Sequence, residues 1–284
     1  MWIPLVVIAV LLLGILALEA KSSGEYSITP GKSTPVAPLI KLSGLKTNAH
    51  PGRILFTDVD LTSLSEWQLI LTHFQKNVQV VPSAALIEPG VSTSELIAQE
   101  YLEMYDAKHS AEVAAFRALG WKVHPTPSGT VITAVQENSP ASRAKLAVGD
   151  LITGLNSAPV RSACQFTSLS HDTPPGTTEV LDVNKVKISG SGQFSYAAPS
   201  TVRVTTAPPP GDLHLESCGA SGRAKSWVGI ALEDGFHYTL PAAVSINTAN
   251  IGGPSAGLAM TLALINQLSK GSLTGGHAVA ATGT

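Results

Sequence analysis

The chain has 284 residues, a formal net charge of −2 and only 13% charged side chains. This length allows two or three domains, each able to bury a core of its own. The weak charge leaves no basic stripe that could neutralise phosphates, so the composition argues against a nucleic-acid partner.

The amino terminus is apolar: residues 1–18 read MWIPLVVIAVLLLGILAL, and the first charged side chain is Glu19. As a helix this segment would span about 27 Å, close to the ~30 Å hydrocarbon core of a bilayer. We therefore expect residues 1–20 to be a single-pass transmembrane anchor at the cell membrane, with the catalytic part on the extracytoplasmic side. No residues precede the segment to fix its orientation. A cleaved signal peptide is the alternative, disfavoured by the absent basic n-region and a poor cleavage sequence.

Turn residues and hydrophobic periodicity divide the rest of the chain. Residues 21–48 are rich in Ser, Pro, Gly and Lys and lack apolar periodicity, which predicts a linker. Ala207-Pro-Pro-Pro-Gly211 predicts a domain boundary. The elements expected between these segments and beyond them are a strand at 52–61, helices at 65–74 and 92–119, short strands over 119–206, strands at 226–232 and 242–248, and an apolar helix at 256–268.

The two cysteines, Cys164 and Cys218, have neither CxxC nor Cys/His spacing. This pattern predicts no metal site and no disulfide framework. Two buried thiols are the favoured interpretation, because free cysteine is commonly buried, and a single disulfide is the alternative.

Several short motifs occur in order between residues 117 and 206: VITAV at 131–135, NSPASRAKL at 138–146, GDLI at 149–152, and Pro-Pro-Gly at 174–176. This order resembles a PDZ domain of the bacterial protease type. The resemblance implies capture of a peptide as an added strand, with its terminal carboxylate on the backbone N–H groups of Leu119, Gly120 and Trp121. The helix around 163–170 would form the other wall. Alternatively, Leu-Gly-Trp only ends a helix and supplies a core aromatic ring.

The candidate nucleophile is Ser255, in the sequence Ile-Gly-Gly-Pro-Ser-Ala-Gly at 251–257. It lies between a predicted strand and the start of the apolar helix. Small neighbours let a substrate backbone approach, and the free N–H groups and dipole of a helix start can stabilise an oxyanion. The alternative is a serine that only caps the helix.

Two protease or esterase patterns contain such a serine. Gly253 to Gly257 satisfies G-x-S-x-G, the nucleophile elbow of lipases and esterases, but no Asp or Glu follows Ser255 to complete that triad. GPSAG preceded by Val-Ser-Ile-Asn at 244–247 and followed by a strand ending in Thr-Gly at 282–283 resembles the Lon-type Ser–Lys proteases. Residues 49–116 resemble the first part of the same domain, and 212–284 the proteolytic part.

The whole chain thus resembles the membrane-anchored, PDZ-containing Lon-like serine proteases of bacteria. This implies an α+β fold in which the PDZ domain is inserted in, or precedes, the Lon-type domain. It also implies an ATP-independent serine endopeptidase, with Gly253 and Ala256 supporting Ser255 and its oxyanion. Thr282 would orient the lysine base, or is an ordinary strand residue.

The lysine base itself is not expected within these residues. In the family it lies forty or more residues after the serine, whereas Lys270 is the only lysine after Ser255. Lys270 would be about 20 Å away along the helix, so we reject it. We therefore expect the chain to stop before its base and to be inactive by itself.

The resemblance has a second departure, and it sets the expected partners. Gly252 stands where ATP-dependent Lon enzymes carry an acidic residue, and Pro30-Gly-Lys-Ser33 fails the phosphate-binding pattern because Tyr26 replaces its first glycine. No ATP, other cofactor or metal is expected. The expected partners are peptide or unfolded protein substrates, the membrane, and further copies of the chain, since Lon-like domains form rings. The alternative function is a catalytically inactive, PDZ-containing peptide-binding adaptor.

Overall fold

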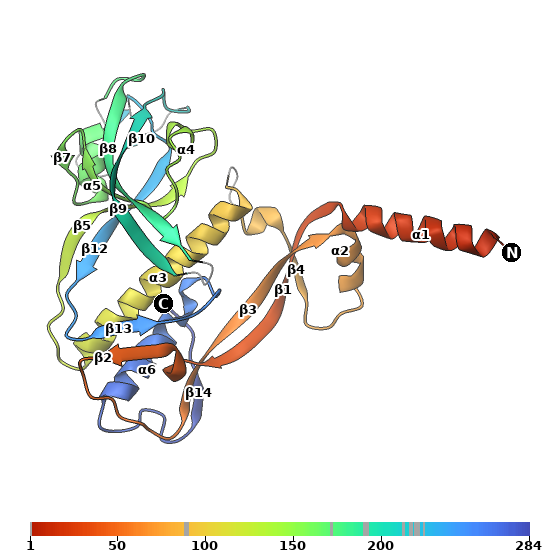
Figure 1. Ribbon diagram of the computed structural model, residues 1–284, viewed down its shortest axis with the longest axis horizontal. Helices are drawn as coiled ribbons and strands as arrows, with labels where there is room; N and C mark the ends of the chain where they lie inside the picture. The colour runs from red at the N-terminus through yellow and green to blue at the C-terminus, as the bar shows by residue number, and fades with distance from the viewer. Residues whose placement is uncertain are drawn as a thin grey trace. The chain divides into compact units, whose positions relative to one another are not determined.

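The computed structural model describes residues 2–87, 91–170, 173–189, 193–211, 214–215, 218, 222–223 and 225–284. Their contacts form two compact units (Figure 1). Unit 1 comprises Met1–Thr34 and Thr57–Pro89, and unit 2 comprises Pro35–Phe56 and Gly90–Thr284. Helices and strands mix in both units, which confirms the α+β class.

Unit 1 is built from helices flanking a small sheet, in which β1 lies between β3 and β4. The pairing of β1 with β4 is antiparallel. Both β1 and β3 continue into unit 2. The elements are α1 (Ile3–Glu19), β1 (Ser22–Pro35), β3 (Arg53–Ser65), α2 (Glu66–Thr72), β4 (Gln79–Pro82) and η2 (Ser83–Ala85).

The apolar α1 has 17 residues and no buried side chain. Its C-terminal Glu19 accepts hydrogen bonds from Ser65 Oγ at 2.8 Å and Gln68 Nε2 at 3.0 Å. Ser65 and Gln68 also form the capping box of α2, which explains why that helix begins where the sequence predicts. A transmembrane anchor is expected over residues 1–20; in the part of the chain described here, no helix reaches the length and apolar character needed to cross a membrane.

Residues 21–48 are not the linker that their composition predicts. They contain β1, the short helix η1 (Ala37–Leu39) and β2 (Ile40–Ser43). β2 pairs antiparallel with β13 (Ala243–Ile246), which places Ile40 opposite Ile246, and both side chains are buried. The prediction was wrong because the partners of these strands lie far along the chain, so local composition does not reveal the pairing.

One half of unit 2 is formed around two long helices, α3 (Thr93–Ala118) and α6 (Gly257–Leu268). Ala107 and Ala111 of α3 pack in one cluster with Ala259 and Ala263 of α6. Short side chains on both helices allow this close packing. β14 (Ala278–Ala280) pairs in parallel with residues 53–55, at the start of β3.

The other half of unit 2 is a sheet with the strand order β12-β5-β6-β8-β9 (Figure 1). Its core includes the fully buried Ile132, Ile152 and Leu181. The elements are β5 (Pro125–Val135), α4 (Pro140–Arg143), β6 (Leu151–Leu155), β7 (Ala158–Pro159), α5 (Ala163–Ser170), β8 (Thr178–Ile188), β9 (Phe194–Thr205), β10 (His214–Leu215), β11 (Gly222–Arg223) and β12 (Ile230–Tyr238).

β12 corrects the predicted domain boundary. The sequence assigns it to the proteolytic part after residue 211, but it pairs antiparallel with β5 along its whole length. The two ends of the segment between β9 and β12 are also paired. Ala207 N–H donates to Trp227 O at 3.0 Å, and Trp227 N–H donates to Ala207 O at 2.8 Å. The sheet around the PDZ motifs therefore extends to Tyr238.

The cysteines are joined, so the prediction of two buried thiols was wrong. Cys164 on α5 and Cys218 form a disulfide with a Cα–Cα distance of 4.8 Å across 54 residues. Ser168 Oγ, one turn further along α5, also donates to Cys218 O at 3.2 Å. Cys218 lies in the segment between β9 and β12 and meets α5 there, which the spacing of the two cysteines does not show.

Candidate functional site

Ser255 lies exposed in a single turn, η3 (Pro254–Ala256), directly before α6. Gly253, in front of this turn, has a positive φ of 79° and donates its N–H to Glu100 O at 2.8 Å. A Cβ on Gly253 would lie 3.0 Å from Glu100 Oε2, and one on Gly252 would lie 2.8 Å from Glu100 Cβ. The two glycines therefore let the loop turn tightly against α3 and present Ser255 at the helix start.

The expected oxyanion donors are only partly available. The Gly253 N–H is already paired with Glu100, so Gly253 supports the loop instead of donating to an oxyanion. Ala256 is the N-cap of α6, and no side chain caps that end of the helix. Backbone carbonyls already accept from two N–H groups at this helix start, because Gly257 N–H donates to Pro254 O and Leu258 N–H donates to Gly283 O. The positive end of the helix dipole is what remains to stabilise negative charge next to Ser255.

The segment around Thr282 clamps the same loop. Gly283 N–H donates to Ser255 O at 2.7 Å, and Leu258 N–H donates to Gly283 O at 2.9 Å. Thr282 Oγ1 contacts Ser255 O at 3.4 Å. The structure thus brings Ser255, Gly253, Ala256 and Thr282 together, although two separate motifs supply them.

Two lysines, Lys270 and Lys108, can be placed relative to the Ser255 loop along α6 and α3. Lys270 follows the twelve residues of α6, which separate it from Ser255 by about 18 Å of helical rise. Burial lowers the pKa of Lys108, but Lys108 is two turns beyond Glu100 on α3. The ionisable group next to the loop is Glu100, whose pKa is raised by partial burial and, secondarily, by the charge of Glu103.

The segment expected to bind a peptide carboxylate is instead the end of α3. Gly120 has a φ of 92° and donates to Arg117 O at 3.0 Å, while Trp121 N–H donates to Phe116 O at 3.0 Å. Leu119 N–H bonds to Ala115 O. The Trp121 ring packs edge-to-face on Phe116, with centroids 5.4 Å apart. In this structure the segment is a Schellman-type helix cap whose N–H groups are occupied.

A second apolar-Gly-apolar sequence, Val228-Gly229-Ile230, lies at the start of β12. Gln136 N–H donates to Gly229 O at 2.9 Å next to the Ile230–Val135 pair. In an antiparallel ladder this pattern directs the N–H and C=O of Ile230 away from β5, toward the sheet edge. Sequence reasoning treated this segment only as a strand and missed that Gly229 begins an edge strand.

This edge faces α5, the helix predicted to form a groove wall. Asp234 Oδ1 of β12 accepts from Ala163 N–H at 2.7 Å, at the first residue of α5. Among the described residues, β5 is the only strand paired with β12. The geometry therefore offers an edge strand beside a helix, which is the arrangement that binds a peptide by strand addition.

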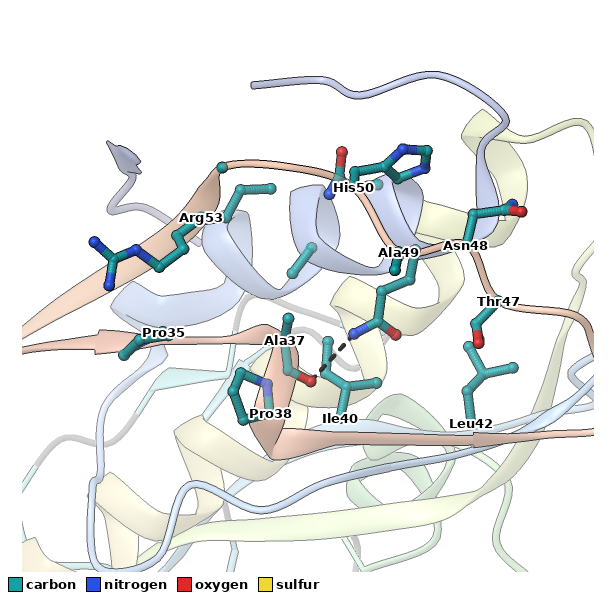
Figure 2. Close-up of a pocket in the computed structure, with 15 residues that line it drawn as sticks. Pro35, Ala37, Pro38, Ile40, Leu42, Thr47, Asn48, Ala49, His50 and Arg53 are labelled. Atoms are coloured by element: carbon teal, nitrogen blue, oxygen red, sulfur yellow. Dashed lines mark hydrogen bonds between the residues drawn. The ribbon is translucent and has the colours of Figure 1, made fainter. Parts of the chain in front are cut away.

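A separate cavity of about 620 Å³ lies beside α6 (Figure 2). It is lined by Ala263, Asn266 and Gln267 of α6 and by residues between Pro35 and Ile54. Gln267 Nε2 donates to Ala37 O at 3.1 Å within it. No residue of the Ser255 loop lines this cavity, so it is not the candidate active site. In the described ranges, no group of His, Cys, Asp or Glu side chains could hold a metal ion.

Comparison with known proteins identifies a domain in one part of the chain. Residues 117–188 match the family model of the PDZ domain. Among solved structures, the PDZ domain of the SdrC-like protein from Listeria monocytogenes is 18% identical, with a TM-score of 0.28, covering 38% of this chain and 90% of that one. The corresponding domain from Listeria innocua is 20% identical, with a TM-score of 0.24, covering 37% and 92%.

A variant of the HtrA-type protease AlgW with a decapeptide is 13% identical, with a TM-score of 0.23, covering 66% of this chain and 61% of that one. No curated protein matches the chain. Together, the family match at residues 117–188 and the strands that surround it show that this chain contains a PDZ domain.

Proposed function

We propose that this chain is the substrate-recruiting and nucleophile-bearing part of an ATP-independent, Lon-like serine endopeptidase. One observation carries the proposal: Ser255 is exposed directly before the start of α6, where no side chain caps the helix, and its carbonyl accepts a hydrogen bond from Gly283 N–H. A serine in this position can attack a peptide carbonyl while the helix N-terminus stabilises the oxyanion.

In this proposal the base is a lysine that residues 1–284 do not supply. A lysine of ordinary pKa, about 10.4, is protonated at neutral pH, so its pocket must lower that pKa by roughly 3 units. The neighbours of Ser255 in the chain are uncharged, as such a pocket needs, and the one acidic group placed next to the loop, Glu100, has a raised pKa because it is partly buried. Because nucleophile and base act as a unit, Ser255 without the lysine has only binding and oxyanion stabilisation to offer.

We further propose that the PDZ domain recruits peptides or unfolded proteins at β12. An extended peptide would add antiparallel to the free edge of β12, beside α5, with its carboxylate near Val228 to Ile230. The outward direction of the Ile230 N–H and the short contact between Asp234 and α5 support this placement.

The disulfide and the exposed apolar helix support an extracytoplasmic location at a membrane surface. Disulfides such as Cys164–Cys218 persist in oxidising compartments outside the cytoplasm. Ten of the large apolar side chains of α1 are exposed, from Ile3 to Leu16, and an apolar phase would cover them favourably. Assembly into a homo-oligomer stays a prediction from the resemblance.

Labelling with a fluorophosphonate tests the proposal in the natural full-length protein. We expect wild-type protein to label and to cleave casein, and Ser255→Ala to do neither while its circular-dichroism spectrum is unchanged. Cleavage by Ser255→Ala would refute the proposed nucleophile. Peptide binding without labelling of wild-type protein would favour the alternative, an inactive peptide-binding adaptor.

A further inference from the structure

A small cavity of about 250 Å³ lies between α3 and the PDZ sheet, and several residues of β12 within 233–238 form part of its wall, whereas no residue of the Ser255 loop lines it. Its wall combines aromatic rings with carboxylates. Ligand pockets for drug-sized molecules measure about 300–1,000 Å³, so this cavity has the size for one side chain or a small ion.

Four aromatic side chains line the cavity: Tyr105, Tyr196, Phe236 and Tyr238. Tyr105 is fixed by a stacked contact with Phe194, with ring centroids 5.6 Å apart. The rings of Phe236 and Tyr238 lie 6.4 Å apart on β12. Burial raises the pKa of Tyr105, so its hydroxyl stays neutral at physiological pH. The faces of neutral aromatic rings attract cations through their quadrupoles.

Two acidic side chains, Asp106 and Glu233, also line the cavity, and both are exposed. Among the described residues, no ion pair or hydrogen bond involves the carboxylate of Asp106 or of Glu233. Burial and then the charge of Glu233 raise the pKa of Asp106 to about 6. Asp106 is therefore largely ionised at neutral pH, and the charge of Glu233 repels it. The nearby His109 is already paired with Glu112 at 3.3 Å.

The strand that carries Glu233 is locally irregular at this wall. The register between β12 and β5 shifts between Gly235 and Phe236, leaving Ser128 without a partner. A Cβ on the buried Gly235 would lie 3.0 Å from Leu151 Cδ1 and 3.1 Å from Ser128 Oγ. β-Bulges redirect side chains, and this one sets the direction of Phe236 at the cavity.

We propose that this cavity binds the cationic side chain of an arginine or lysine carried by a peptide. Aromatic faces with unpaired carboxylates are the chemistry that selects an organic cation. A neighbouring cavity of about 450 Å³ shares Tyr105, His109, Phe236 and Tyr238 with it. The second cavity gives room for the main chain that carries the cation. This inference is independent of the proposed function, because it needs neither Ser255 nor the lysine base.

Calorimetric titration of the full chain at pH 7.5 tests the proposal. The probes are hexapeptides amidated at the C-terminus, which removes the carboxylate that a PDZ loop would bind. One carries a central arginine and the other carries citrulline, which has a similar shape and no charge. We expect the citrulline peptide to bind at least about tenfold more weakly. Equal affinities would overturn the proposal.

Substitutions of cavity residues test whether the arginine peptide binds in this cavity. Asp106→Asn and Glu233→Gln should each weaken arginine-peptide binding about tenfold, and Tyr105→Leu should weaken it about threefold. Asp106→Asn removes a repulsion, so it should fold as well as wild-type. Glu137→Gln is the matched control, an exposed acid of the same domain that does not line the cavity, and should bind normally. Unchanged binding by Asp106→Asn would overturn the site.

N-acetyl-arginine methylamide carries the arginine side chain without the rest of a peptide, so it tests whether the site needs a peptide or only a cation. We expect it to bind more weakly than the peptide, because it makes no contact in the second cavity. Binding as tight as that of the peptide would show that a free cation suffices and would overturn the peptide part of the proposal.

Discussion

The Ser255 loop and the PDZ groove are built in opposite ways. The loop is a run of consecutive residues, 252–257, whose glycines and proline fix its local shape before α3 and Gly283 pack against it. The groove edge is β12, which reaches β5 only through a pairing distant in sequence. The comparison teaches that the geometry of a compact motif can be read from consecutive residues, whereas a strand edge depends on topology.

The largest expected effect is a loss of stability in the PDZ sheet, and it tests whether the Ser255 loop depends on that sheet. Leu181 is fully buried in the PDZ core, so Leu181→Ala should reduce the free energy of unfolding by about 2–5 kcal/mol through a cavity. Thermal unfolding followed by circular dichroism measures the loss. If Ser255 labelling at 15 °C also disappears, the loop depends on the PDZ sheet, and the contrast between the two regions fails.

A backbone change should break the loop and spare the groove. Gly253→Ala places a Cβ 3.0 Å from Glu100 Oε2 at a φ of 79°, which should cost about 1–3 kcal/mol and abolish fluorophosphonate labelling. Gly271→Ala is the control, because nothing lies within 4 Å of its added Cβ and its φ is not positive. Normal labelling of Gly253→Ala would mean that the tight turn does not position Ser255.

Two glycines decide where the peptide carboxylate binds. Gly229→Ala would bring a Cβ within 2.3 Å of Ser139 Cβ at a φ of 85°, so it should weaken binding of a peptide with a free C-terminus at least about tenfold. Gly120→Ala meets no atom within 4 Å, and its positive φ should cost only about 1 kcal/mol of stability. Fluorescence anisotropy measures both affinities. Loss of binding in Gly120→Ala alone would restore Leu119 to Trp121 as the carboxylate loop.

The smallest expected effect is a pH dependence where α3 meets the PDZ sheet. The pKa of Asp106 is raised to about 6, so its contribution to stability is complete below its unfolded value of 3.8 and is lost as pH rises through about 6. Glu103 and His109 on α3 and Glu233 on β12 face the same carboxylate.

Thermal midpoints of wild-type and Asp106→Asn protein between pH 4 and pH 7 isolate this contribution. The midpoint of wild-type protein should fall relative to that of the variant as pH rises, and level off above about pH 7. A constant difference across the range would show that Asp106 titrates normally.

Local signals predicted much of the fold. The helix expected at 92–119 is α3, which Ser92 caps and which ends before Gly120, because serine is favoured at an N-cap and glycine tolerates a positive φ. The hairpin at Asn156 and Ser157, both with positive φ, joins β6 to β7 even without the usual glycine. These features depend on neighbours only a few residues apart, so the sequence shows them.

The site was predicted only in part for the same reason. Ser255 and its glycines were identified from one motif, but the approach of Glu100 to that loop depends on how α3 packs against α6. The carboxylate loop was assigned to Leu119, Gly120 and Trp121 because that segment precedes the PDZ motifs in the chain. The N–H groups of this segment instead donate hydrogen bonds to carbonyl groups of α3.

The sequence by itself identified Ser255 as a candidate nucleophile, most helix boundaries and the PDZ motifs, because each depends on a local backbone preference or on adjacent residue types. Only the tertiary structure decided that residues 21–48 form strands, that Cys164 meets Cys218, and that β12 completes the PDZ sheet. The packing of the whole chain selects which strands and cysteines pair when they are distant in sequence. Patterns of neighbouring residues therefore cannot predict these pairs.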